Sequence, residues 1–99
     1  MPAYVIFDVH VNDPAVYDEY QASARRPSVN SAEFARALVR GGKVETLEGG
    51  WDAGRLIILE FPDAEAARAW YNSAGYQEAK AIRERAASTR AVLVEGISG

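Results

Sequence analysis

The chain has 99 residues, the size of one small domain that would span residues 1–99. Its net charge of −3 does not show the basic excess typical of nucleic-acid-binding proteins, so we expect no nucleic-acid partner. Without cysteine it can form neither disulfides nor thiolate metal sites, which fits a reducing compartment. No signal peptide is recognisable, and the apolar runs are too short to span a membrane. The sequence therefore predicts a cytoplasmic protein without a membrane partner.

The first predicted element is a strand over residues 3–11, followed by a helix. Side chains of a strand alternate between its two faces. The helix is predicted to begin at Asp13-Pro14, because Asp caps free amides and Pro suits the first helical position. One face of the strand would be apolar, with Ala3, Val5, Phe7, Val9 and Val11, and the other mixed, with Tyr4, Ile6, Asp8 and His10.

The middle of the chain carries weaker signals. Residues 28–37 are compatible with a short helical turn capped by Asn30 or Ser31. A second strand is predicted to start at 38–40, to bulge at Gly41-Gly42 and to continue over 43–48. Residues 49–54 are rich in glycine and predict a loop between antiparallel strands.

The clearest strand covers 55–61, where the apolar run RLIILEF suggests burial on both faces. Asp63 is predicted to cap a helix with an apolar stripe that includes Trp70, and Gly75 to end that helix in a left-handed conformation. A further helix over about 76–87 and a last strand over 90–95 complete the order β-α-β-β-α-α-β. This order predicts an α+β, ferredoxin-like fold, a four-stranded antiparallel sheet with its helices on one face.

In this fold the first and third strands are central neighbours, and the second face of the sheet needs a cover. Both faces of the central strands are too apolar for water. A second copy of the chain, packed sheet against sheet, would cover the free face and enlarge a small core. We therefore expect a homodimer.

Polar residues on the first strand raise the question of function. A carboxylate buried in a sheet is costly unless it is paired, so Asp8 and His10 imply polar partners or a ligand. Glu60 on the third strand is a possible neighbour, and Arg83 could pair with a carboxylate or receive an anionic substrate. The candidate catalytic residues are Asp8, His10 and Glu60, and the candidate ligand-binding residues are Tyr4, Asp8, His10, Tyr17, Trp70, Tyr76 and Arg83.

A structural interpretation competes with each of these assignments. A His and an Asp two residues apart can form an ion pair at the edge of a core, Glu60 and Arg83 can pair with each other, and tyrosines are commonly core residues. One His and no Cys leave no usual zinc site, and there is no phosphate-binding glycine loop or nucleophile elbow. We expect no metal and no cofactor, so any catalysis would be acid–base chemistry or would depend on the ligand's own reactivity.

Four segments together resemble a family of small bacterial proteins known as domain of unknown function 1330, within the dimeric α/β-barrel superfamily. They are AYVIFDVHVNDPAVYDEY, LVRGGKVETLEGGW, RLIILEFPDAEAARAWYNSAGYQEAKAIR and AVLVEG. The resemblance implies a ferredoxin-like protomer and a homodimer whose two sheets form a dimeric α/β barrel. It also implies a cleft between the sheet and the helices, where we expect Asp8, His10 and Glu60 to meet Trp70, Tyr76 and Arg83.

Two classes of function remain open at this point. The first is a homodimer that binds a small molecule in the cleft of each protomer. The alternatives are a non-catalytic structural or protein-interaction dimer, and a cofactor-independent enzyme similar to the monooxygenases or isomerases of the superfamily. The resemblance itself confers no activity.

Overall fold

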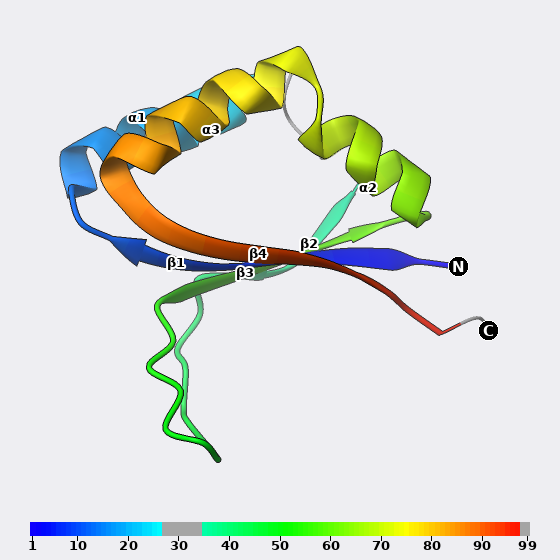
Figure 1. The fold of residues 1–99 in the computed structure, drawn as a ribbon, viewed down its shortest axis with the longest axis horizontal. Helices are drawn as coiled ribbons and strands as arrows, with labels where there is room; N and C mark the ends of the chain where they lie inside the picture. Colours follow the sequence, from blue (N-terminus) through cyan, green and yellow to red (C-terminus); the bar gives the residue numbers. More distant parts are fainter. Residues whose placement is uncertain (27–34, 98–99) are drawn as a thin grey trace.

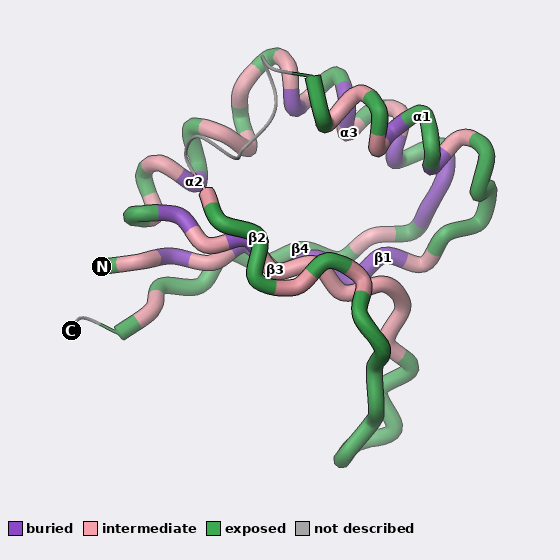
Figure 2. Tube along the Cα trace, turned by 180° about the vertical axis from the view of Figure 1, so that it is seen from behind, coloured by how far each residue is buried: buried purple, intermediate pink, exposed green. Residues whose placement is uncertain are grey.

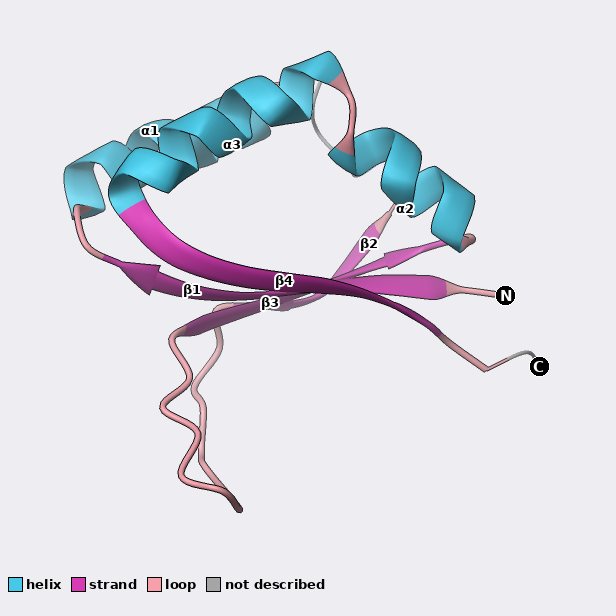
Figure 3. Cartoon of the chain, in the orientation of Figure 1, coloured by secondary structure: helices cyan, strands magenta, loops and turns pink. Residues whose placement is uncertain are grey.

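The computed structural model describes residues 1–26 and 35–97. Four antiparallel strands form one sheet in the order β2-β3-β1-β4, and the helices cover one face of it (Figures 1 and 3). The α+β, ferredoxin-like fold is therefore confirmed, with β1 and β3 at the centre. Its elements are β1 (Ala3–Val11), α1 (Pro14–Ala24), β2 (Arg36–Arg40), β3 (Arg55–Phe61), α2 (Ala64–Tyr71), α3 (Ala74–Ala86) and β4 (Ala87–Glu95).

The helices begin at side-chain caps. The carboxylates of Asp13 and Asp63 accept from the backbone amides three residues later, as the sequence predicts. The prediction for Gly75 is wrong, because α2 ends at Tyr71 and Gly75 lies in the first turn of α3. Ser73 separates α2 from α3. Its hydroxyl donates to the carbonyl of Trp70 at 2.7 Å and accepts from the amide of Tyr76. Within the described ranges, no helix is long and apolar enough to cross a membrane.

The second strand differs most from its prediction. It begins at Arg36, and its irregularity lies between Ala37 and Val39 rather than at the glycine pair. The strand predicted over 43–48 does not form; residues 42–53 are a loop that projects from the sheet, away from the helices (Figure 1). Gly41 causes the change, because its φ of +73° turns the chain out of the sheet just after its amide has bonded to Leu56. Most of the helical turn predicted over 28–37 falls outside the described residues.

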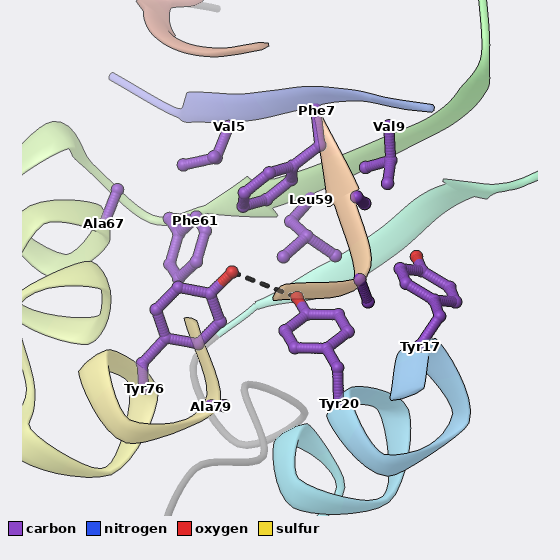
Figure 4. Close-up of a cluster of buried hydrophobic side chains, with 12 residues drawn as sticks. Val5, Phe7, Val9, Tyr17, Tyr20, Leu59, Phe61, Ala67, Tyr76 and Ala79 are labelled. Carbon is purple, nitrogen blue, oxygen red and sulfur yellow. Dashed lines mark hydrogen bonds between the residues drawn. The ribbon is translucent and has the colours of Figure 1, made fainter. Parts of the chain in front are cut away.

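The hydrophobic core lies between the apolar face of the sheet and the helices (Figures 2 and 4). Phe7 and Phe61 of the central strands meet the ring of Trp70 on α2 at centroid distances of 6.5 and 5.4 Å. Tyr76, fully buried on α3, packs on the same indole at 4.2 Å. The face of β1 that carries Phe7 therefore meets the helices, and the face that carries Asp8 points away from them.

A candidate ligand-binding cleft

A cleft of about 450 Å³ lies between the sheet and α1, and its lining also includes residues of α2 and α3. Aromatic rings from both layers form much of its wall, which is built from Phe7, Tyr17, Tyr20, Trp70 and Tyr76. The amphipathic spacing of Tyr17 and Tyr20 along α1 turns both phenols toward the sheet. The cleft therefore combines apolar surface with hydroxyl groups at one place in the fold.

Three arginines complete the wall. Arg25 follows α1, Arg40 ends β2 and Arg55 begins β3. None of the described residues that line the cleft is an aspartate or a glutamate. The guanidinium of Arg55 lies across Gly41, where a Cβ atom would be 2.5 Å from its Cζ atom. Gly41 thus allows both the turn at the end of β2 and the position of this guanidinium.

A chain of hydrogen bonds runs behind the aromatic wall. The Nη1 atom of Arg83 donates to the hydroxyl of Tyr76 at 2.6 Å, and this hydroxyl lies 3.0 Å from that of Tyr20 (Figure 4). Arg83 is only 3% exposed, and its guanidinium carbon lies 5.4 Å from the centre of the Phe7 ring. The cation is therefore held by phenol oxygen and aromatic faces.

Two polar atoms of the cleft residues are buried without a hydrogen-bond partner in the described part of the chain. They are the hydroxyl of Tyr17 and the Nε atom of Arg55, and the two side chains lie close enough for the guanidinium to interact with the phenol. Burial raises the pKa of Tyr17 and that of Tyr76 above the ordinary value of a phenol. Both hydroxyls therefore keep their protons at neutral pH and can act as donors.

The structure divides the predicted site residues into two groups. Tyr17, Trp70 and Tyr76 line the cleft, and Arg83 lies directly behind Tyr76. Sequence reasoning missed Arg40 and Arg55 as members of the same wall, and it considered the phenol of Tyr20 but did not select it for the ligand-binding set. Arg55 carried a usable signal, because alternation along β3 puts it on the face of Ile57, Leu59 and Phe61.

The other predicted residues lie on the opposite face of the sheet, so the expected meeting of the two groups is wrong. Residues directly paired in an antiparallel sheet share a face, and Asp8 pairs with Leu56 and Arg90 while Tyr4 pairs with Glu60. His10 follows Asp8 on that face. The sheet itself separates Tyr4, Asp8, His10 and Glu60 from the cleft.

On this outer face Asp8 joins the sheet to the projecting loop. Its carboxylate accepts from the amide of Gly54 at 2.8 Å, the indole of Trp51 at 3.1 Å and Arg90 at 3.2 Å. His10 Nε2 lies 3.6 Å from the same carboxylate. Burial alone would raise the pKa of Asp8, but these donors outweigh it and hold the pKa below its ordinary value. Asp8 is thus a satisfied ion at the base of the loop.

Glu60 has a partner of its own on the outer face. Its carboxylate lies 3.1 Å from Nη2 of Arg36 on the neighbouring strand β2. The ion pair between Glu60 and Arg83 that the sequence allowed is therefore wrong, since the sheet lies between them. Across residues 1–26 and 35–97, no cluster of three or more His, Cys, Asp or Glu residues is arranged to hold a metal ion.

Known structures share this fold at low sequence identity. RPA0582 of Rhodopseudomonas palustris, a protein of unknown function, has a TM-score of 0.72 at 18% identity, with 99% of this chain and 84% of that chain covered. A dimeric ferredoxin-like protein of unknown function from Thermobifida fusca has a TM-score of 0.62 at 16% identity, with 94% and 89% covered. A variant of SnoaB, a cofactor-independent oxygenase from Streptomyces nogalater, has a TM-score of 0.61 at 15% identity, with 99% and 95% covered.

No functionally curated protein matched the sequence. A family model, in contrast, matches residues 2–97, which is almost the whole chain and spans all seven elements of the fold. The chain therefore belongs to the family described as Domain of unknown function (DUF1330).

Proposed function

We propose that the protein binds a small molecule in the cleft between its sheet and its helices. The observation that carries this proposal is a cleft of about 450 Å³ that combines aromatic walls with buried, unpartnered polar atoms. Ligand sites in proteins are mostly apolar concave spaces of roughly 300–1,000 Å³ with a few well-placed polar groups. Tyr17 and Trp70 would contact the ligand directly, and the fully buried Tyr76 would support the wall together with Arg83.

The proposal leaves four of the predicted residues outside the site. Tyr4, Asp8, His10 and Glu60 cannot reach a ligand in the cleft from the outer face, and Asp8 and Glu60 already have partners there. The described lining of the cleft then offers no Asp, Glu or His as a base. A second candidate function, oxygenation without a cofactor as in SnoaB, would have to rely on the reactivity of the substrate itself.

Filling the cleft is expected to abolish ligand-induced stabilisation. Ala24 lines the cleft near the end of α1, so an Ala24→Phe side chain would occupy the space of a ligand. In a thermal-shift screen of small carboxylates, phenols and lactones, at least one compound should stabilise the wild type, by about 2.7 kcal/mol at a hundredfold excess over its Kd. The same compound should leave Ala24→Phe unchanged.

Ala22→Phe is the matched control, because Ala22 lies two residues away on an exposed face of α1. This variant should respond to the ligand as the wild type does. Equal stabilisation of the Ala24 and Ala22 variants would place binding outside the cleft and contradict the proposal. A screen in which no compound stabilises the wild type would also count against it.

The proposal includes a homodimer formed through the outer face of the sheet. Val92 and Val94 of β4 lie on this face and are 58% and 45% exposed, and Leu47 and Trp51 of the projecting loop are exposed as well. Apolar side chains grouped on one uncovered sheet face are typical of a protein interface. Structural neighbours of this chain are described as dimeric ferredoxin-like proteins, which supports the same arrangement.

Placing a charge in this face is expected to dissociate the dimer. In sedimentation equilibrium the wild type should have twice the mass of the chain, and Val92→Asp should shift toward the monomer because a carboxylate would be buried without a partner. Ala22→Asp, on the helical side, should leave the mass unchanged. A monomeric wild type, or a dimer insensitive to Val92→Asp, would exclude this interface.

A further inference from the structure

The cleft collects positive charge in a chain that is negative overall. Arg25, Arg40 and Arg55 line it, although the net charge of the protein is −3. Among the described residues none of these three arginines forms an ion pair. The ion pairs between lysine or arginine and carboxylates that the described residues form lie elsewhere, and they are Arg26–Glu78, Arg36–Glu60, Lys80–Glu84, Arg85–Glu19 and Asp8–Arg90.

Arg83 adds a buried cation behind the same wall, again without an acidic partner in the described part of the chain. A buried charge is costly unless an opposite charge or hydrogen bonds compensate it. Its guanidinium donates to the hydroxyl of Tyr76 and also interacts with that of Tyr20, and its Nε atom has no hydrogen-bond partner among the described residues. The arrangement therefore favours the binding of an anionic ligand in the cleft.

The hydrogen-bond chain ends in a donor that faces the cleft. A guanidinium only donates, so Tyr76 accepts from Arg83, and with Tyr76 as the donor in its bond to Tyr20 the chain runs from Arg83 through Tyr76 to Tyr20. Tyr20 then keeps its own proton for a further acceptor, and Tyr20 lines the cleft. Together with the hydroxyl of Tyr17 and the Nε–H of Arg55, this makes three donors around one space.

We propose that the cleft selects planar organic carboxylates, an inference that rests on the proposed function. The carboxylate oxygens accept from Tyr17, Tyr20 and Arg55, which satisfies donors that the fold leaves without acceptors. The ring system of the ligand packs against Phe7 and Trp70. A neutral ligand would satisfy fewer donors, and a cation would meet the arginines at close range.

Three ligands that differ in charge but share one ring system test this inference. 2-Naphthoate is an anion, 2-naphthamide is its neutral counterpart, and 2-naphthylmethylammonium is a cation. By isothermal titration calorimetry, 2-naphthoate should bind at least about tenfold more tightly than the amide, and the cation should not bind measurably. Raising the salt concentration should lower the affinity for 2-naphthoate and leave the affinity for the amide unchanged.

Variants distinguish the effect of the donors in the cleft from the effect of the protein's overall charge. Arg55→Met should lower the affinity for naphthoate about tenfold and leave the affinity for the amide unchanged. Tyr17→Phe should also weaken the binding of naphthoate. Its melting temperature should stay close to or above that of the wild type, because the hydroxyl it removes is buried and donates to no acceptor among the described residues. Arg85→Met is the charge-matched control, since Arg85 pairs with Glu19 on the surface, and it should bind naphthoate as the wild type does.

The outcomes distinguish the two proposals. Naphthamide binding as tightly as naphthoate, with both lost in Ala24→Phe, would overturn the selectivity for carboxylates and keep the proposed function. A preference for naphthoate that survives both Arg55→Met and Tyr17→Phe would overturn the assignment of the donors. Saturable binding by none of the three ligands would overturn the carboxylate inference alone when the thermal-shift screen yields another ligand, and both proposals when that screen yields none.

Discussion

Asp8→Asn is expected to lower the free energy of unfolding by about 2–4 kcal/mol at pH 7. The carboxylate of Asp8 accepts from the amide of Gly54 and the indole of Trp51, and it is 5% exposed. An asparagine amide offers one acceptor oxygen and one NH₂ group, so one of these donors would face another donor. The loss of charge also weakens the contact with Arg90, which contributes little because its side chain is 75% exposed.

The effect of Asp8→Asn should depend on pH. The pKa of Asp8 in the folded protein lies below its ordinary value, so the folded state binds this proton more weakly than the unfolded state does. The stability that this carboxylate contributes is therefore fully present above the unfolded pKa of about 3.9 and is lost as the pH falls through the folded pKa. The difference between wild type and variant should be constant above about pH 5 and shrink below about pH 4.

Urea unfolding at one protein concentration between pH 3 and 7 measures this difference. The matched control is Asp52→Asn, which removes an exposed carboxylate from the same loop. It should change the free energy of unfolding by less than about 0.5 kcal/mol. Similar losses in the two variants, or a loss for Asp8→Asn that does not change with pH, would contradict the structural role of the buried carboxylate.

Gly54→Ala is expected to lower the free energy of unfolding by about 1–3 kcal/mol. The added Cβ would clash with the backbone carbonyl of Val9 on the adjacent strand, with its carbon at 2.8 Å, and would lie 3.1 Å from Cγ of His10. A backbone carbonyl inside the sheet cannot rotate away as a flexible side chain can. The two strands would have to separate where the amide of Gly54 donates to Asp8.

Gly42→Ala is the control for the same substitution in the same loop, because no atom lies within 4 Å of the Cβ that it would add. Its stability should stay within about 0.5 kcal/mol of the wild type. In the Asp8→Asn background, Gly54→Ala should cost less than in the wild type, since both changes weaken one contact. Full additivity of the two changes would show that the clash and the hydrogen bond are independent.

These two predictions concern a part of the protein that the sequence presented as a catalytic candidate. Asp8 and His10 are unusual in an apolar strand, and the structure accounts for Asp8 through three donors from outside the strand. All three donors, from Trp51, Gly54 and Arg90, lie more than 40 residues away along the chain. No local pattern around Asp8 reveals such partners, so a buried carboxylate in a sequence can indicate a loop anchor as well as a site.

The sequence analysis predicted a cleft between the sheet and the helices, but it identified only some of the residues that line this cleft. Tyr17, Trp70 and Tyr76 could be identified because amphipathic helices place their aromatic residues toward the core. Arg55 and Tyr20 were not selected, although both carry the polar groups of the cleft. Alternation along β3 indicates the face on which Arg55 lies, but the role of Arg55, like that of Tyr20, depends on what packs opposite it.

The sequence by itself determined the order of the elements, the central pairing of β1 with β3 and the apolar face of β1. The element order and the apolar face follow from local spacing, because alternation and capping depend on residues only a few positions apart, and the pairing of β1 with β3 follows from the fold that this order predicts. The tertiary structure alone decided that the apolar face of β1 meets the helices, which puts Asp8 and His10 on one side of the sheet and Tyr76 and Arg83 on the other. It also decided that Gly41 ends β2 and positions Arg55 at the cleft. Both outcomes depend on contacts between segments far apart in the chain, and the spacing of residues within one segment carries no information about them.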